Sequence, residues 1–281
     1  MSVPEVKPIA LYVHWPWCVR KCPYCDFNSH ALGAGVDETR YINALLKDLD
    51  AGIALAGKRP LSSLFFGGGT PSLMSEAGFE RLMRGIGDRL PFTEDVEVTL
   101  EANPGTHEAA RFAAYAANGV NRFSIGVQSF NDRFLKTLGR IHTREQALAA
   151  IETALKLVDN LNLDVMYALP GQSLDEAQED VRMALSCGST HLSFYELTIE
   201  EGTAFYKREP EGLPDNDLAA QMGEMVQTRL GEAGFEHYEV SGYAKVGRRC
   251  RHNLAYWTFG DYIGIGAGAH GKITTQAGII R

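Results

Sequence analysis

YVHWPWCVRKCPYCDF, residues 12–27, holds three of the chain's five cysteines, at positions 18, 22 and 25. Three thiolates this close together, on a loop that leaves a strand, can each bind one iron of a cubane cluster. Because the loop has no fourth cysteine, one iron stays open and can take the amino and carboxylate groups of S-adenosylmethionine (SAM). Cys18, Cys22 and Cys25 therefore predict a [4Fe–4S] cluster with an open iron.

A zinc knuckle and three reduced core cysteines are the alternatives for this loop. Zinc needs four ligands, and only His14 and His30 lie nearby in the sequence. A disulfide framework would spread its cysteines through a small secreted chain, whereas here the number is odd and Cys187 and Cys250 stand alone. Metal binding or catalysis in a reducing compartment is the better interpretation.

On either side of the loop, the chain alternates strand-like and helix-like segments. The short apolar runs are 9–13, 61–66, 96–100, 122–127, 161–167 and 191–195. Helical spacing marks 37–56, 75–90, 107–118, a segment from 131, 143–158 and 174–185. Helices between successive strands predict right-handed βαβ crossovers and a parallel sheet covered on both faces. An open doubly wound sheet and a partial TIM-like barrel both fit this pattern.

The alternation ends near residue 200. Polar loops lead into an amphipathic helix over 217–233 and a strand-like segment over 237–243. We therefore divide the chain into 1–205, an α/β barrel with the cysteine loop, and 206–281, the start of a C-terminal α+β region.

Polar groups and glycines stand at the ends of five successive strands. In order, they are the cysteine loop, Gly67–Thr70, Glu101, Gln128 and Asp164. In α/β barrels, functional groups gather at the carboxyl ends of the strands. The pattern predicts one shared site at the mouth of a barrel.

The run GGGTP, residues 67–71, needs more than a turn to explain it. A strand-to-helix turn with Pro71 at the first helical position needs one glycine, hardly three. Glycines also let a backbone approach a ligand where a Cβ would clash. No Gly-Lys-Ser/Thr follows, which excludes a Walker loop. We expect Gly68, Gly69 and Thr70 to contact a bound ligand.

Together these motifs resemble the radical SAM enzymes. The spacing Cys-x3-Cys-x2-Cys with Tyr24 before the third cysteine is their signature, and residues 12–27 are similar to the oxygen-independent coproporphyrinogen III oxidase-like group. Further similar stretches follow in order at 65–72, 101–106, 122–132, 138–143, 162–172, 191–203 and 250–257. The resemblance covers residues 12–271 and implies a partial (β/α)6 barrel, a [4Fe–4S] cluster and SAM.

The same resemblance implies roles for single side chains. The residues that it assigns to SAM binding are Tyr12, Tyr24, Glu101, Gln128, Arg140 and Asp164. Asp164 would take ribose hydroxyls, and Arg140 would pair with the methionine carboxylate or with the carboxylate of the third strand end. Tyr24 would lean on adenine and Tyr12 on bound SAM. An ordinary core aromatic remains the alternative for each tyrosine, and a solvated arginine remains the alternative for Arg140.

Phe27 departs from the oxidases, which carry a fourth cysteine two residues after the third. The CDF pattern and HNLAYW, residues 252–257, are similar to the haem-chaperone subgroup, whose members bind haem and transfer it to haem-requiring proteins. The expected function is haem trafficking, with oxidative decarboxylation of coproporphyrinogen III as the alternative and a metal-binding structural protein as a third. Whether SAM is cleaved stays open.

His252 is a candidate haem ligand through its place in that motif, with a structural histidine as the alternative. The basic run over 245–251 is a candidate partner for porphyrin propionates, or a solvated loop. Cys250 within it is a second candidate ligand, or a small buried side chain.

Composition excludes other classes of protein. With 281 residues and 45% hydrophobic side chains, the chain can bury a large core. A net charge of −8 disfavours nucleic acid as a partner. Without a long apolar run or a basic-then-apolar N-terminus, we expect no transmembrane segment, no secretory signal and a cytoplasmic location. Because the family continues beyond a position equivalent to Gly271, we expect the C-terminal region to be truncated.

Overall fold

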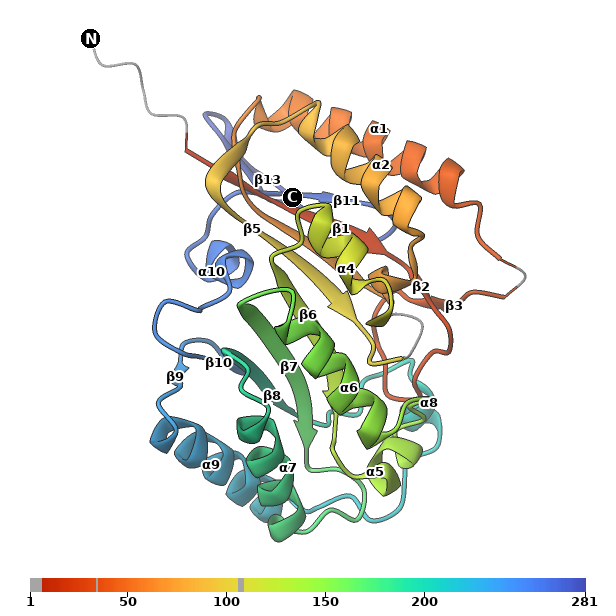
Figure 1. Cartoon of the computed structure of the whole chain (residues 1–281), viewed down its shortest axis with the longest axis vertical. Helices are drawn as coiled ribbons and strands as arrows, with labels where there is room; N and C mark the ends of the chain where they lie inside the picture. Colours follow the sequence, from red (N-terminus) through yellow and green to blue (C-terminus); the bar gives the residue numbers. More distant parts are fainter. Residues whose placement is uncertain (1–6, 34, 106–108) are drawn as a thin grey trace.

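A curved nine-stranded sheet forms the centre of the computed structural model, which describes residues 7–33, 35–105 and 109–281 (Figure 1). The strand order among these residues is β11-β1-β4-β5-β6-β7-β8-β10-β9. Its central strands are β1 (Ile9–Trp15), β4 (Leu61–Gly68), β5 (Phe92–Ala102), β6 (Arg122–Gln128), β7 (Asn160–Tyr167) and β8 (His191–Glu196). These six pair in parallel, which confirms the predicted strands and sheet.

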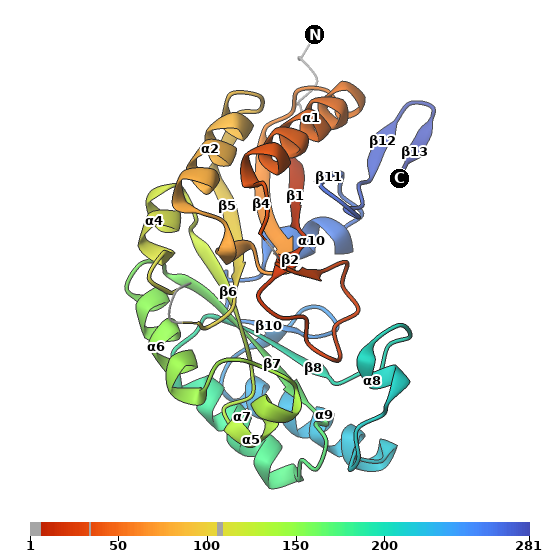
Figure 2. The same ribbon diagram turned by 90° about the vertical axis from the view of Figure 1, so that its right-hand side faces the viewer.

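Helices between these strands cover the outer side of the curved sheet (Figure 2). They are α1 (Glu38–Ala56), α2 (Glu76–Gly87), α4 (Phe112–Ala117), α5 (Asp132–Thr137), α6 (Arg144–Leu155) and α7 (Leu174–Ser186), with a 3₁₀ turn at Pro71–Leu73. The sheet curves without closing, as expected for a partial (β/α)6 barrel.

Side-chain caps explain why several helices begin where the sequence predicts. The Asp37 carboxylate accepts a hydrogen bond from the backbone of Arg40 at the start of α1. Capping boxes that begin at Thr143 and Ser173 start α6 and α7. Within the helix predicted over 107–118, the structure shows α4 over 112–117. Residues 107 and 108 lie outside the described residues, as do motif residue 106 and residues 1–6.

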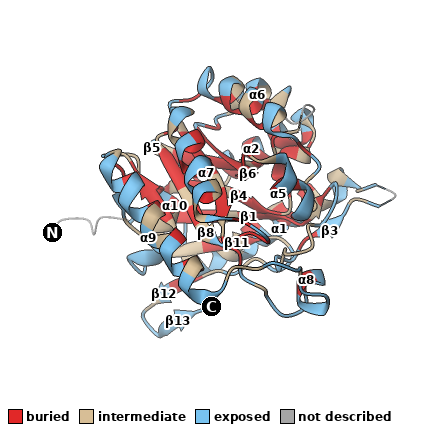
Figure 3. Cartoon of the chain, turned by 90° about the horizontal axis from the view of Figure 1, so that it is seen from below, coloured by how far each residue is buried: buried red, intermediate tan, exposed pale blue. Residues whose placement is uncertain are grey.

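Both faces of the central strands are buried, as parallel sheets require. All seven residues of β6 are buried, and so are six of the seven in β1. Buried residues concentrate on the sheet and on the inner faces of the helices, while α8 (Ala204–Lys207) is mostly exposed (Figure 3). None of the helices in the described part of the chain has the length and hydropathy needed to cross a bilayer.

Residues after 205 extend both edges of the barrel sheet. They form α9 (Asn216–Glu232), β9 (Glu236–His237), β10 (Gly242–Ala244), α10 (Arg251–Trp257), β11 (Tyr262–Ile265) and the hairpin of β12 (Ile273–Thr275) and β13 (Gly278–Ile280). Strand β10 pairs antiparallel with β8, and β11 pairs parallel with β1. The strand expected over 237–243 is two short antiparallel strands. The division at residue 205 stays a prediction.

Candidate functional site

The cysteine loop lies at the carboxyl end of the barrel, and a short pair of strands holds its neck. Strand β2 (Trp17–Cys18) pairs in parallel with β3 (His30–Ala31). The neck is also bonded to the glycine run, since the amides of Gly69 and Thr70 donate to the carbonyls of Trp15 and Trp17, each at 2.7 Å. The loop is therefore fixed over the end of β4.

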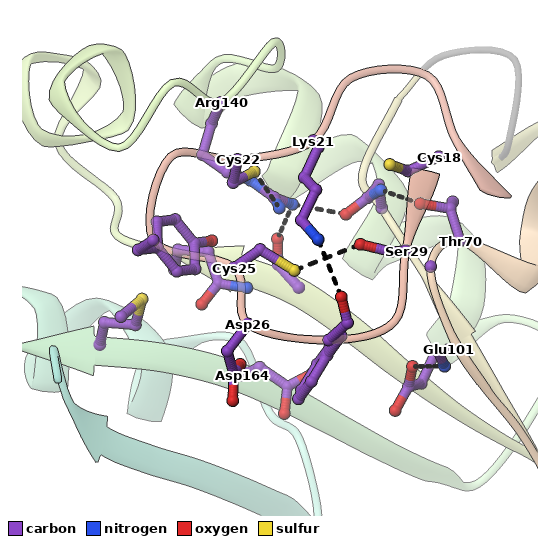
Figure 4. A pocket seen from close by; sticks show the side chains of 18 of the residues that line it. Cys18, Lys21, Cys22, Cys25, Asp26, Ser29, Thr70, Glu101, Arg140 and Asp164 are labelled. Carbon is purple, nitrogen blue, oxygen red and sulfur yellow. Dashed lines mark hydrogen bonds between the residues drawn. The ribbon is translucent and has the colours of Figure 1, made fainter. Parts of the chain in front are cut away.

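The three loop cysteines line one cavity of ≈ 420 Å³, hereafter the cysteine cavity (Figure 4). Predicted site residues that line it are Cys18, Cys22, Tyr24, Cys25, Gly68, Gly69, Thr70, Glu101, Gln128, Arg140 and Asp164. The ends of β1, β4, β5, β6 and β7 thus meet at one mouth, as the sequence pattern predicts.

Each loop thiol has its own weak partner. The Sγ of Cys18 lies 3.5 Å from the carbonyl of His30, and that of Cys25 lies 3.4 Å from Ser29 Oγ. Within the described residues, no three His, Cys, Asp or Glu side chains are already gathered as a metal site. Because thiol hydrogen bonds are weak, little opposes rotation of these side chains toward iron.

The charge of the loop fits a cationic iron cluster. Burial raises the pKa of Cys18, and the neighbouring Cys25 and Cys22 raise it further because three thiolates repel one another. A positive group between them relieves this repulsion, and metal binding displaces the thiol protons. Three thiols facing one cavity fit a cluster bound through three irons.

Packing explains the glycines at 68 and 69 better than contact with a ligand does. A Cβ on Gly69 would lie 2.5 Å from the carbonyl oxygen of Trp17, and one on Gly68 would lie 2.6 Å from the ring of His14. Gly68 also has a φ of 111°, which disfavours other residues. The glycines therefore let β4 approach the first strand and the neck of the cysteine loop.

Of the five carboxyl groups that line the cysteine cavity, Glu101 and Asp164 are the two predicted to bind SAM. Burial, together with the charge of Asp164, raises the pKa of Glu101 to about 8, so this carboxyl holds a proton at pH 7. It accepts a hydrogen bond from the amide of Gly68 at 3.2 Å. Asp164 accepts from Ser124 Oγ and Asn162 Nδ2, each at 2.9 Å, although burial raises its pKa. Both are polar groups available to a ligand.

Arg140 reaches into the cavity beside the cysteines, which excludes the solvated alternative. Its Nη2 donates to Asn103 Oδ1 at 2.5 Å and to the carbonyl of Gly126 at 2.7 Å, and Nη1 lies 3.6 Å from Cys22 Sγ. Its buried Nε has no hydrogen-bond partner among the described residues. The guanidinium can therefore still pair with an anionic ligand group.

Gln128 ends β6 in a strained conformation. Its φ is 68°, and the pairing of β6 with β7 shifts register at this point. Its Oε1 accepts a hydrogen bond from Tyr195 at 2.6 Å. Strain of this kind, at the end of a barrel strand, is typical of ligand sites. Sequence reasoning missed Tyr195 and Asn103, although both stand at strand ends.

Tyr24 and Tyr12 lie in different places. Tyr24 lines the cysteine cavity and packs near Phe205 at 6.4 Å between ring centroids. Tyr12 instead lines a second cavity of ≈ 660 Å³, which shares Phe27, Gly68 and Glu101 with the first. The structure therefore places Tyr12 in one cavity with Gly68 and Glu101, but outside the cysteine cavity that the other predicted SAM contacts line.

His252 is a core histidine, contrary to its expected role as a haem ligand. It is 1% exposed. Its Nδ1 lies 3.1 Å from Ser63 Oγ and its Nε2 lies 2.7 Å from the hydroxyl of Tyr256. Burial lowers its pKa to about 3. With both ring nitrogens engaged, the ring is not available to iron.

The basic run over 245–251 is also engaged elsewhere. Arg249 pairs with Glu236 at 3.0 Å and Arg251 with Asp95 at 2.5 Å. Cys250 is buried, and burial raises the pKa of its thiol to about 12. These residues line neither the cysteine cavity nor the second one. The structure therefore does not place them as propionate partners or as a second thiolate ligand.

Comparison with known proteins agrees with this geometry. The radical SAM superfamily pattern matches residues 12–184. The chain is 52% identical to the haem chaperone HemW of Escherichia coli (strain K12), over 98% of this chain and 73% of that protein. It is 47% identical to HemW of Haemophilus influenzae (strain ATCC 51907 / DSM 11121 / KW20 / Rd), over 99% of this chain and 74% of that protein.

A solved structure also shares the fold. The chain superposes on coproporphyrinogen III oxidase (HemN) from Escherichia coli, a radical SAM enzyme, with a TM-score of 0.83. The alignment covers 94% of this chain and 64% of that chain, at 23% sequence identity. At this identity the likeness concerns the fold alone.

Proposed function

Since the chain belongs to the radical SAM superfamily and, within it, to the HemW haem chaperones, we propose that it binds haem and transfers it to haem-requiring proteins. The observation that carries this proposal is the 52% identity to a haem chaperone over 98% of the chain. Decarboxylation of coproporphyrinogen III is disfavoured, because Phe27 stands where the oxidases carry a cysteine and HemN shares only the fold.

The cofactors are a [4Fe–4S] cluster and SAM. We propose that Cys18, Cys22 and Cys25 hold the cluster, supported by the three thiols that face one cavity. When bound, the cluster supplies an open iron for SAM and an electron for its sulfonium. The protein's part is to bring three thiolates together and to enclose them under the loop.

The polar strand ends are proposed to bind SAM. Arg140, with one unpartnered nitrogen, would hold the methionine carboxylate. Asp164, which already accepts two hydrogen bonds, would accept ribose hydroxyls. Glu101, protonated at neutral pH, would donate a hydrogen bond to an acceptor atom of SAM. Tyr24 would cover adenine.

Three further proposals concern context. The protein acts in the cytoplasm and delivers haem to haem-requiring acceptor proteins. Nucleic acid is not a partner, because a net charge of −8 neutralises few phosphates. Residues 1–205 carry the cofactors, and 206–281 form a separate C-terminal region.

The test is anaerobic reconstitution followed by parallel titration with haem and coproporphyrinogen III. We expect stoichiometric haem binding and transfer of that haem to a haem-depleted acceptor protein. With coproporphyrinogen III, SAM and a strong reductant, we expect no decarboxylated product. Multiple-turnover release of CO2 would contradict the carrier function and establish the oxidase.

A further inference from the structure

A second cavity lies beside the cysteine cavity and is the larger of the two. We call it the aromatic cavity; its volume is ≈ 660 Å³, against ≈ 420 Å³ for the cysteine cavity. Cofactor sites have volumes of about 300–1,000 Å³ and mostly apolar walls. Side chains of Tyr12, Phe27, Tyr256, Phe259 and Tyr262 belong to its wall. It has the size and character of a site for a large flat molecule.

Hydrogen bonds and ring contacts fix several of these aromatic side chains. The hydroxyl of Tyr12 donates to His14 Nδ1 at 3.1 Å. The Tyr256 hydroxyl lies 2.7 Å from His252 Nε2. The rings of Tyr256 and Tyr262 pack edge-on, with 4.6 Å between their centroids. The HNLAYW motif thus contributes to the wall through Tyr256, which buried His252 positions.

Two phenyl groups of the wall face water. Phe27 is 58% exposed and Phe259 is 82% exposed. Large aromatic side chains left in solvent beside a cavity indicate a surface that a ligand covers. A planar macrocycle would remove both rings from water.

His270 also lines this cavity, on a loop with a fixed backbone. The loop is closed by two hydrogen bonds between the backbones of Tyr262 and Lys272, at 2.9 and 2.8 Å. A Cβ on Gly264 would lie 1.9 Å from the carbonyl oxygen of His270, so the two backbones are in contact. The amide of Gly266 donates to Asp48 on α1 at 2.8 Å. The position of His270 is therefore set before any ligand arrives.

The imidazole of His270 is exposed and has no hydrogen-bond or ion-pair partner within the described residues. The other histidine of the wall, His14, is engaged at both nitrogens, because its Nε2 donates to the carbonyl of Asn28 at 2.9 Å. The ammonium of Lys272 is held by Asp261 at 3.2 Å and by three oxygens. Among the described residues of this wall, His270 therefore offers the imidazole that can bind a metal.

The charge of the wall suits an anionic ligand. Its one acidic residue among those described is Glu101, and burial raises the pKa of that carboxyl to about 8. Glu101 therefore adds no negative charge to the wall at pH 7. The charge of Lys272 is offset by Asp261, and the cationic side chain of Arg281 also belongs to the wall.

The aromatic cavity adjoins the cluster loop. Phe27 contributes to both cavities, and Asn28 Nδ2 donates to the carbonyl of Ala267 at 2.7 Å, three residues before His270. A Cβ on Gly268 would lie 2.5 Å from that same Asn28 nitrogen. The loop that carries the cysteines and the loop that carries His270 are thus packed on each other.

We propose that the aromatic cavity is the site of the haem cargo and that His270 is an axial ligand of its iron. This assignment rests on the proposed chaperone function and adds to it the location of the haem site and the ligand of the haem iron. The aromatic side chains contact the faces and edges of the porphyrin, and the imidazole binds the iron through a neutral ring nitrogen. His252 acts as a positioning residue through Tyr256 and does not touch the iron.

The test is a haem titration of the cluster-loaded full chain and of His270→Ala, followed by absorption and electron paramagnetic resonance spectra of ferric haem. His237→Ala is the matched control, because His237 is exposed on β9 at the far edge of the sheet. We expect His270→Ala to lose the imidazole-ligated spectrum and to weaken binding by about tenfold. Added imidazole should restore that spectrum in His270→Ala, and His237→Ala should match the unaltered chain.

Circular dichroism and iron content of His270→Ala guard against misfolding, and imidazole rescue gives a second measurement on the same variant. If the unaltered chain binds haem and His270→Ala gives the same spectrum, the assignment of the cavity ligand is wrong while the chaperone function stands. If the unaltered chain binds no haem, the cavity assignment and the chaperone function are both wrong.

Discussion

Replacing Glu101 by Gln should stabilise the protein without cofactors and leave its binding of SAM nearly unchanged. The pKa of this carboxyl is about 8 in the folded chain, against 4.5 as its ordinary value. The folded chain therefore keeps a proton that the unfolded chain releases above pH 4.5. Between pH 4.5 and 8 the free energy of unfolding falls because of this group, and it stays lowered above pH 8.

The magnitude follows from the pKa difference, about 8 minus 4.5. At about 1.4 kcal/mol per unit, the ceiling is about 5 kcal/mol. Screening within the protein makes the real effect smaller than this ceiling. We expect the gain in free energy of unfolding of Glu101→Gln over the unaltered chain to be larger at pH 8 than at pH 5 by roughly 1–3 kcal/mol. The amide oxygen can still accept the hydrogen bond from Gly68. Denaturant unfolding of the cofactor-free chain under reducing conditions, at both values of pH, measures this difference.

SAM binding should survive Glu101→Gln and weaken in Glu101→Ala. The Gln amide keeps a donor where the protonated carboxyl has one, whereas alanine loses a hydrogen bond worth about 1–3 kcal/mol, roughly five- to a hundredfold in Kd with the cluster intact. Glu94→Gln is the control, since Glu94 lies on the same strand but is exposed. If Glu101→Gln is no more stable at pH 8 relative to pH 5, this carboxyl does not store a proton. If Glu101→Ala binds SAM normally, this carboxyl does not serve the ligand.

Three further outcomes are expected. Alanine at any of the three loop cysteines should abolish the iron–sulfur cluster, whereas Cys187→Ala should keep it. The iron and sulfide content of each variant measures this, and the reverse result would contradict the ligand assignment. Arg140→Lys should weaken SAM binding by about tenfold at unchanged iron content, because a lysine cannot present a planar fork; equal affinity by equilibrium binding would remove the arginine from the site. His252→Ala should lower the free energy of unfolding by about 2–4 kcal/mol, because two core hydrogen bonds are lost. The spectrum of imidazole-ligated haem should stay the same. Loss of that spectrum would make His252 the ligand of the iron.

Local signals in the sequence were enough to predict the six central strands and most helices. Apolar runs such as 122–127 and caps such as Asp37 act within a few residues, and the structure follows them closely. Strand β11 was missed because its four residues, Tyr262–Ile265, become a strand through pairing with β1. That pairing joins segments some 250 positions apart, a separation that no local pattern reports.

The mouth of the barrel was predicted because parallel strands place their ends together whatever the side chains are. What the sequence could not give was the direction of single side chains. Tyr12 lines the second cavity and not the cysteine cavity, and His252 turns toward Ser63 of β4. A motif fixes neither which face of a helix is buried nor where one cavity ends and the next begins.

Phe27, Gly68 and Glu101 belong to the walls of both cavities, so a shift of any of these three residues alters both cavities. Thermodynamic linkage makes any such effect mutual: if SAM changes the affinity for haem by some factor, haem changes the affinity for SAM by the same factor. The SAM concentration would then set the affinity for haem, and bound haem would change the affinity for SAM. Two titrations of SAM, with and without haem, measure that factor, and identical curves would mean that the shared wall transmits nothing.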